Sequence, residues 1–180
     1  MGRPKALVEL DDETLVRRAF RVLADGGCAP LLVVLGAAAE DVRRQLPPEV
    51  LSVVADDWES GMGASLRAGL AAVPAGSEAA LVHLVDLPGV TAAAVRRLVA
   101  DPVDARVLRR ASYGGRPAHP VLLGREHWAA VRETATGDAG ARGYLGGNPD
   151  VELVECGDVA APEDVDTPEQ LARFRRRQTP

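Results

Sequence analysis

Leu81-Val82-His83-Leu84-Val85-Asp86-Leu87-Pro88 joins an apolar run to an acidic residue and a proline. The apolar run from Ala79 to Val85 predicts a buried strand, and Asp86 follows it directly. An acidic group at the carboxyl edge of a parallel sheet lies where such folds place their ligands. A carboxylate at that edge suits Mg²⁺, which takes one or two protein oxygens together with substrate phosphates. A lone Asp after a strand is equally typical of a helix cap or a turn.

The rest of the chain repeats this pattern of short apolar runs and longer helical segments. Such alternation predicts βαβ units on a mostly parallel sheet, and hence an α/β protein. We expect strands over 31–35, 50–54, 79–85, 107–113, 121–123 and 151–154. Helices are expected after a cap at Asp11 or Asp12, around 40–45, at Gly61, after Thr91, near Arg125, after Gly140 and after Thr167. No repeat or linker divides the sequence, so residues 1–180 are predicted to form a single domain.

Composition narrows the class of protein. The net charge of −5 and a pI near 5.3 argue against a nucleic-acid binder, which needs a dominant basic surface. No run approaches the ~20 apolar residues of a membrane span. Two distant cysteines, Cys28 and Cys156, lack metal or redox spacing and indicate buried thiols in a reducing cytoplasm. We therefore expect a cytoplasmic protein that acts on a small molecule.

Two glycine-containing segments have the chemistry of phosphate binding. Met1-Gly2-Arg3-Pro4-Lys5-Ala6-Leu7 reads as the second half of a phosphate-binding loop, with Lys5 as a point charge for phosphate oxygens. In Asp57-Trp58-Glu59-Ser60-Gly61-Met62-Gly63-Ala64-Ser65-Leu66, free N–H groups at a helix start beside Ser65 offer an anion site. The alternative for the second segment is that its glycines merely allow a tight turn before a core helix, with Met62 in the core.

These segments also resemble the motifs of the molybdopterin nucleotidyltransferases, of the cytidylyltransferase branch in particular. The first heptad is similar to the end of LAAGxGxRMGxPK, and residues 57–66 are similar to W-x-x-G-M-x-x-S-L. Asp86 stands at the metal-binding Asp of a GDxP motif, with Val85 in place of the Gly. Residues 113–120 resemble a G-x-R-G-H-P loop, 137–142 a GDxGAR motif, and 164–169 a DIDTPED segment.

The resemblance implies a Rossmann-like three-layer sandwich of the nucleotide-diphospho-sugar transferase type. It also implies an Mg²⁺-dependent transfer of a nucleotidyl group, with CMP favoured, from a nucleoside triphosphate to a phosphate acceptor such as molybdopterin. The implied catalytic residues are Lys5 and Asp86, and the implied metal ligands are Asp86 and Asp166. The implied substrate-binding residues are Gly2, Arg3, Gly61, Ser65, His119 and Arg142.

The start of the chain differs from the family pattern. In the family a buried strand and a Gly-rich turn precede the Met, and that strand lies inside the sheet. Each backbone group left unpaired in its absence costs about 1–3 kcal/mol. We therefore expect Met1 to be an internal Met taken as a start, with roughly ten to fifteen further residues in the working protein.

Two other functions stay open at this point. The first is an NAD(P)H-dependent oxidoreductase of the nicotine-blue type. The second is a non-catalytic chaperone that carries molybdopterin to a molybdoenzyme partner. The nucleotide base, the acceptor and the oligomeric state are left open by the sequence.

Overall fold

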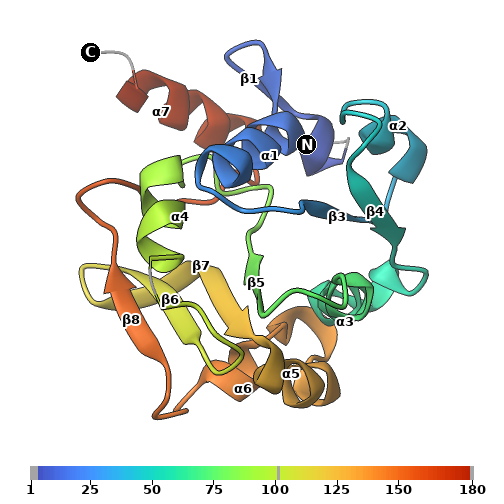
Figure 1. Cartoon of the computed structure of the whole chain (residues 1–180). Coiled ribbons are helices and arrows are strands. Elements are labelled where there is room, and N and C mark those ends of the chain that lie inside the picture. The colour runs from blue at the N-terminus through green and yellow to red at the C-terminus, as the bar shows by residue number, and fades with distance from the viewer. Residues whose placement is uncertain (1–3, 101, 179–180) are drawn as a thin grey trace.

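The computed structural model describes residues 4–100 and 102–178 and has helices packed around several short sheets (Figure 1). The largest sheet contains β5 (Ala79–Val82), β6 (Leu108–Tyr113), β7 (Arg116–Gly124) and β8 (Glu152–Glu155) in the order β5-β7-β6-β8. β6 and β8 are parallel, whereas β7 is antiparallel to both of its neighbours. The α/β class is confirmed, but this sheet is mixed and not mostly parallel. The antiparallel strand has a local cause, because a tight turn at Gly114-Gly115 joins β6 directly to β7.

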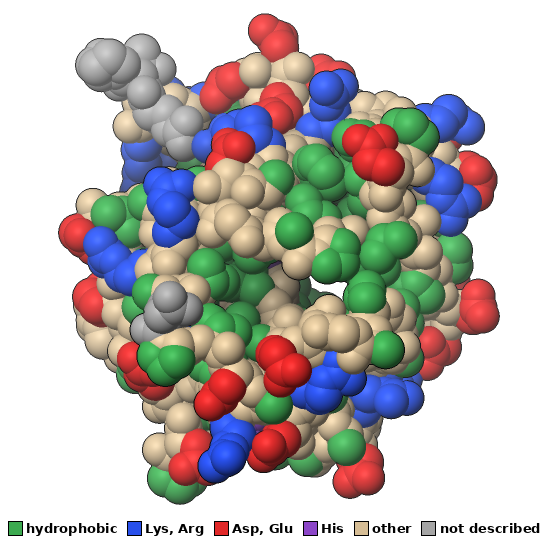
Figure 2. All heavy atoms as spheres, in the orientation of Figure 1, with side chains coloured by type: hydrophobic (Ala, Val, Ile, Leu, Met, Phe, Trp, Pro, Cys, Tyr) green, Lys and Arg blue, Asp and Glu red, His purple; other side chains and the backbone are tan. Residues whose placement is uncertain are grey.

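A second, two-stranded sheet pairs β3 (Leu32–Leu35) with β4 (Leu51–Val54) in parallel, and α2 (Ala39–Arg43) lies between them in the chain. No ladder between described residues joins β3 to β5. Figure 2 shows an opening in the surface, in the part of the molecule where β5 and α3 lie in Figure 1. The expected strand before Met1 is not tested by the structure and stays a prediction.

The helices form two groups that cover different parts of the sheets (Figure 1). α1 (Leu15–Asp25) and α4 (Ala92–Leu98) pack together through Val22 and Val95. α3 (Met62–Ala72), α5 (Trp128–Thr134) and α6 (Arg142–Leu145) surround a core that includes Leu123 of β7. Phe174 of the C-terminal helix α7 (Pro168–Gln178) packs against Val8 and Leu10, which follow η1 (Lys5–Leu7) and lie at or beside β1 (Glu9–Leu10), so the two ends of the described chain meet. Three further short turns of 3₁₀ helix are η2 (Trp58–Ser60), η3 (Arg125–His127) and η4 (Gly137–Ala139).

The predicted caps have mixed outcomes. Thr91 accepts a hydrogen bond from the backbone N–H of Ala94, as a cap of α4 should. The prediction that Asp11 or Asp12 caps α1 is wrong, because α1 begins at Leu15. Asp11 and Asp12 instead have φ of 53° and 62° and form the turn between β1 (Glu9–Leu10) and β2 (Glu13–Thr14). Positive φ at both central residues is what a two-residue hairpin turn of type I′ requires, and Asp tolerates it.

Two predicted boundaries also differ. The strand expected to run to Val85 ends at Val82, which leaves Asp86 in a turn after the strand. The segment expected as a loop over residues 113–120 is a hairpin instead, and His119 lies within β7. Within residues 4–100 and 102–178, no helix combines the length and apolar character that crossing a membrane requires.

Candidate active site

One lysine and two aspartates from distant parts of the chain meet at the end of β5. The Nζ atom of Lys5 lies 2.8 Å from Oδ2 of Asp86 and also donates to Oδ1 of Asp166. Asp86 is the most enclosed of the three, with 20% of its side chain exposed, against 41% for Lys5 and 44% for Asp166. The structure therefore brings together three residues that separate sequence motifs had predicted as catalytic or metal-binding residues.

Local hydrogen bonds hold each of these residues in place. The backbone oxygen of Asp86 accepts from the N–H of Val165 at 2.9 Å, which ties the turn after β5 to the segment that carries Asp166. At the start of α7, Oε1 of Gln170 accepts from the backbone N–H groups of Asp166 and Thr167, and Oγ1 of Thr167 accepts from that of Gln170. This reciprocal pair is a capping box, so a helix start fixes the backbone of Asp166.

The ion pairs shift the pKa of Lys5 and that of Asp166. Burial alone would lower the pKa of Lys5, but hydrogen bonds and charge from Asp166 and Asp86 outweigh it and the pKa is raised. The hydrogen bond from Lys5 lowers the pKa of Asp166. Lys5 is therefore a cation and Asp166 an anion at neutral pH.

These three residues line a cleft of about 410 Å³. Its walls also include Met62, Leu84, His119, Asp138 and Asp164. The prediction that Met62 belongs to the core is wrong, since the residue is 41% exposed and lies at the mouth of the cleft. Asp138 was also missed, because the motif around it drew attention to Arg142. The cleft is lined by more carboxylates than ammonium groups, and this excess of negative charge attracts a cation.

His119 lines the cleft, and a second histidine, His83, lies near it outside the lining. Burial is the main cause of the lowered pKa of His119, and the nearby charges of Arg110 and Arg142 lower it further. His119 is therefore a neutral imidazole at pH 7, able to donate one hydrogen bond and accept another. Burial lowers the pKa of His83 to about 4, and its Nδ1 atom is buried with no partner among the described residues.

The other predicted substrate-binding residues do not contact Lys5, Asp86 or Asp166 through hydrogen bonds or ion pairs in the described part of the chain. Gly61 has φ of 111°, and a Cβ there would come within 2.7 Å of Oδ1 of Asp138, so the close approach requires glycine. Arg142 donates to the backbone oxygen of Asp138 at 2.7 Å and holds that loop. Ser65 lies in α3 outside the cleft lining. Gly2 and Arg3 lie outside the described residues.

The two carboxylates suit a divalent cation. Both already contact one positively charged group, the ammonium of Lys5, so they can share a cation between them. Their hard oxygen atoms are the ligands that Mg²⁺ and Mn²⁺ prefer. The described residues contain no cluster of three or more His, Cys, Asp or Glu side chains placed to hold a metal. Phosphate oxygens and water would have to complete the coordination, as is usual for Mg²⁺.

A cleft that places carboxylates and a lysine beyond the end of a strand in an α/β fold is suited to phosphate chemistry. Residues 1–152 match the model of the MobA-like NTP transferase domain, and the chain belongs to this family. Its fold is the Rossmann-like fold of the nucleotidyltransferases, and the protein is a transferase of that class.

Individual relatives extend this comparison. The chain is 40% identical to a protein named nicotine blue oxidoreductase from Paenarthrobacter nicotinovorans, over 97% of this chain and 89% of the relative. It is 35% identical to a probable molybdenum cofactor guanylyltransferase from Opitutus terrae, over 52% of this chain and 45% of that one.

Among solved structures, it is similar to a homologue of Mycobacterium tuberculosis Rv0371c from Mycobacterium sp. strain JC1. The TM-score is 0.83 at 28% identity, covering 98% of this chain and 89% of the other. Rv0371c itself was solved in complex with manganese, and there the TM-score is 0.79 at 25% identity, over 96% of this chain and 91% of the other.

Proposed function

We propose that this protein is an Mg²⁺-dependent nucleotidyltransferase that moves a nucleotidyl group, CMP for preference, from a nucleoside triphosphate to the phosphate of a molybdopterin-like acceptor. The observation that carries the proposal is the placement of Lys5 between Asp86 and Asp166 in a cleft of about 410 Å³. Membership in the MobA-like family supports the reaction type, and the molybdenum cofactor relative supports the acceptor.

The reaction needs no covalent enzyme intermediate. An oxygen of the acceptor phosphate attacks the α-phosphorus of the triphosphate and forms the new P–O bond. The bond from the α-phosphorus to the bridging oxygen breaks, and its electron pair leaves with pyrophosphate. A phosphate monoester has its second pKa near 6, so the attacking oxygen is already deprotonated at pH 7. The protein therefore needs no general base, and its task is to position the reactants and to balance charge.

Each residue of the cleft has a role in that task. Lys5 exchanges its carboxylate partners for phosphate oxygens and neutralises the charge that develops toward pyrophosphate. Asp86 and Asp166 would hold the Mg²⁺, and the ion when bound supplies positive charge to the phosphate oxygens. His119 stays uncharged, and because its Nδ1–H faces the backbone oxygen of Val82 at 3.5 Å, it offers Nε2 as a hydrogen-bond acceptor to the acceptor molecule.

Pyrophosphate release tests the proposal directly. The protein is incubated with Mg²⁺ and molybdopterin and with CTP, GTP or ATP in turn, both as the present chain and extended upstream of Met1. Asp86→Asn should lower kcat by about 10²–10³-fold. Asp150→Asn, which removes an exposed carboxylate outside the cleft, should leave the rate unchanged. Failure of all three nucleotides in both forms, or full activity of Asp86→Asn, would contradict the proposal.

An NAD(P)H-dependent oxidoreductase is the second candidate, because the relative at 40% identity is named as one. It predicts oxidation of NADPH by a quinone-like dye with no triphosphate present and no loss in Asp86→Asn. The remaining alternative, a molybdopterin-carrying chaperone, predicts pterin binding without turnover that survives the same substitution. The set of assays separates the three functions by nucleotide requirement, turnover and dependence on Asp86.

A further inference from the structure

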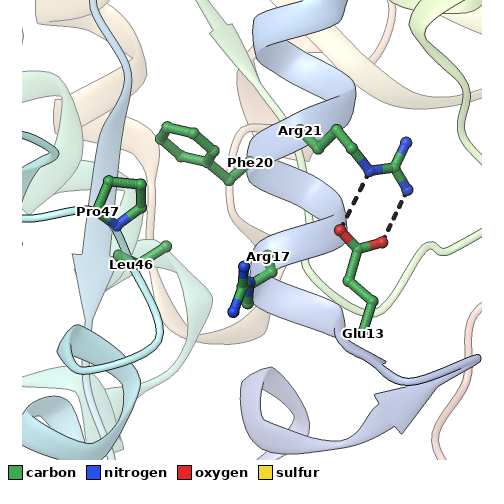
Figure 3. Close-up of a pocket in the computed structure, with 6 residues that line it drawn as sticks. All are labelled: Glu13, Arg17, Phe20, Arg21, Leu46 and Pro47. Atoms are coloured by element: carbon green, nitrogen blue, oxygen red, sulfur yellow. Dashed lines mark hydrogen bonds and ion pairs between the residues drawn. The ribbon is translucent and has the colours of Figure 1, made fainter.

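A second cavity, of about 220 Å³, lies between α1 and the segment that joins α2 to β4. In Figure 3 the ring of Phe20 and the side chain of Arg17 lie on the side of α1 that looks toward Leu46 and Pro47. Phe20 and Leu46 are only half-buried, although both are large apolar side chains. The cavity shares none of its lining residues with the cleft of Lys5 and Asp86.

Positively charged side chains outnumber negatively charged ones in the lining of this cavity. Arg21 is held by Glu13 through two hydrogen bonds, of 3.1 Å from Nε and 2.7 Å from a terminal nitrogen, so this pair is neutral as a unit (Figure 3). Arg17 makes no hydrogen bond or ion pair with another residue that the structure describes. The two arginines of the lining exceed its one glutamate, so the exposed guanidinium of Arg17, whose charge also acts on Glu13, lies beside an aromatic ring and two apolar side chains.

Size and charge together define the class of ligand. An apolar cavity of about 150 Å³ is enough to hold benzene. The cavity here exceeds that by roughly 70 Å³, which is room for one small polar group on a single ring. A guanidinium binds a carboxylate through two parallel hydrogen bonds, and a single positive charge matches a single negative one. A phosphate would bring a larger group and a second negative charge that the guanidinium of Arg17 alone does not balance.

We propose that this cavity is a binding site for a small aromatic monocarboxylate. The ring packs between Phe20 and the Leu46-Pro47 segment, and the carboxylate pairs with Arg17. The site is independent of the proposed transfer reaction, since no residue of the catalytic cleft takes part in it.

The test is a titration followed by the backbone amide signals of the full chain in NMR, with benzoate as the probe. Benzoate should shift the amides of Arg17, Phe20 and Leu46 in a saturable manner. Benzamide has nearly the same shape but no charge, so it cannot form the ion pair with Arg17. Loss of an ion pair worth about 1 kcal/mol should make benzamide bind about fivefold more weakly than benzoate. Phenyl phosphate should bind no more tightly than benzoate.

Two charge-matched variants isolate the guanidinium. Arg17→Gln should remove the difference between benzoate and benzamide. Arg132→Gln, which deletes an exposed arginine of α5 outside the cavity, should preserve it. Equal affinity for benzoate and benzamide in the unaltered protein would overturn the proposal. So would tighter binding of phenyl phosphate, or shifts centred on the catalytic cleft instead of α1.

Discussion

Lowering the pH from 7 to 5 should destabilise the protein through His83. The imidazole lies just beyond β5, and its Nδ1 atom is buried without a partner among the described residues. Burial is the main reason that its pKa falls to about 4, and the nearby His119 lowers it further while Asp86 opposes both. Protonation of His83 would place a positive charge on a partly buried ring whose Nδ1 atom has no partner among the described residues, so the folded state resists protonation.

The magnitude follows from the difference between the two states. An unfolded histidine has a pKa near 6.5, and the folded one a pKa of about 4. Because the folded pKa is the lower one, the contribution is complete above pH 6.5 and is lost as the pH falls toward 4. The full loss is about 3 kcal/mol, and about 2 kcal/mol of it falls between pH 7 and pH 5.

Urea unfolding at pH 7, 6 and 5, followed by far-UV circular dichroism, measures this loss in the parent and in His83→Gln. The readout is the change in unfolding free energy with pH, so a variant that is less stable at every pH still gives an answer. Contributions from groups that do not interact with His83 are common to both proteins and cancel in the comparison. His83→Gln should lose about 2 kcal/mol less than the parent between pH 7 and pH 5. Equal losses in the two proteins would refute the reasoning.

Three further outcomes are expected. Lys5→Met removes the ammonium that competes for two carboxylates, so Mn²⁺ without nucleotide should bind about fivefold more tightly by electron paramagnetic resonance, and weaker binding would contradict this. Glu155 accepts from three backbone N–H groups, and these hydrogen bonds lower its pKa from 4.5 to about 2. Its contribution to stability is therefore complete above pH 4.5 and is lost as the pH falls toward 2. Glu155→Gln should speed hydrogen exchange of the backbone amides in the β6–β7 turn at pH 7. Unchanged exchange rates would contradict the idea that the carboxylate of Glu155 holds this turn. Leu123→Ala, in a fully buried position, should cost about 3–5 kcal/mol by urea unfolding, against about 0.5 kcal/mol for the exposed Leu51→Ala.

The parts of the fold that the sequence predicted well depend on local chemistry. The Thr91 cap and the Thr167-Pro168 helix start are decided within four residues, and both are present. The Asp11-Asp12 hairpin was missed because two Asp residues before an apolar periodic segment suit a cap as well as a turn. Only the pairing of Glu9 with Thr14 distinguishes the two, and that pairing depends on what the strands pack against.

The site was predictable in its chemistry but not in its assembly. Motifs identified Lys5, Asp86 and Asp166 one at a time, and nothing in their spacing indicates that one ammonium contacts both carboxylates. Met62 was misassigned for a related reason. Its spacing with Leu66 and Leu70 marks one face of a helix, but periodicity does not reveal that the face extends past the core to the edge of a cleft.

The contact between Lys5 and the two aspartates has a consequence for the order of ligand binding. While Lys5 is bound to Asp86 and Asp166, it competes with a metal ion for their oxygens. A triphosphate changes this relation, because its oxygens give the ammonium a new partner and release both carboxylates. Lys5 therefore opposes metal binding without nucleotide and supports it with nucleotide. Affinity for Mn²⁺ should rise when CTP is present, and the rise should be larger in the parent than in Lys5→Met, since only the parent has an ammonium to exchange.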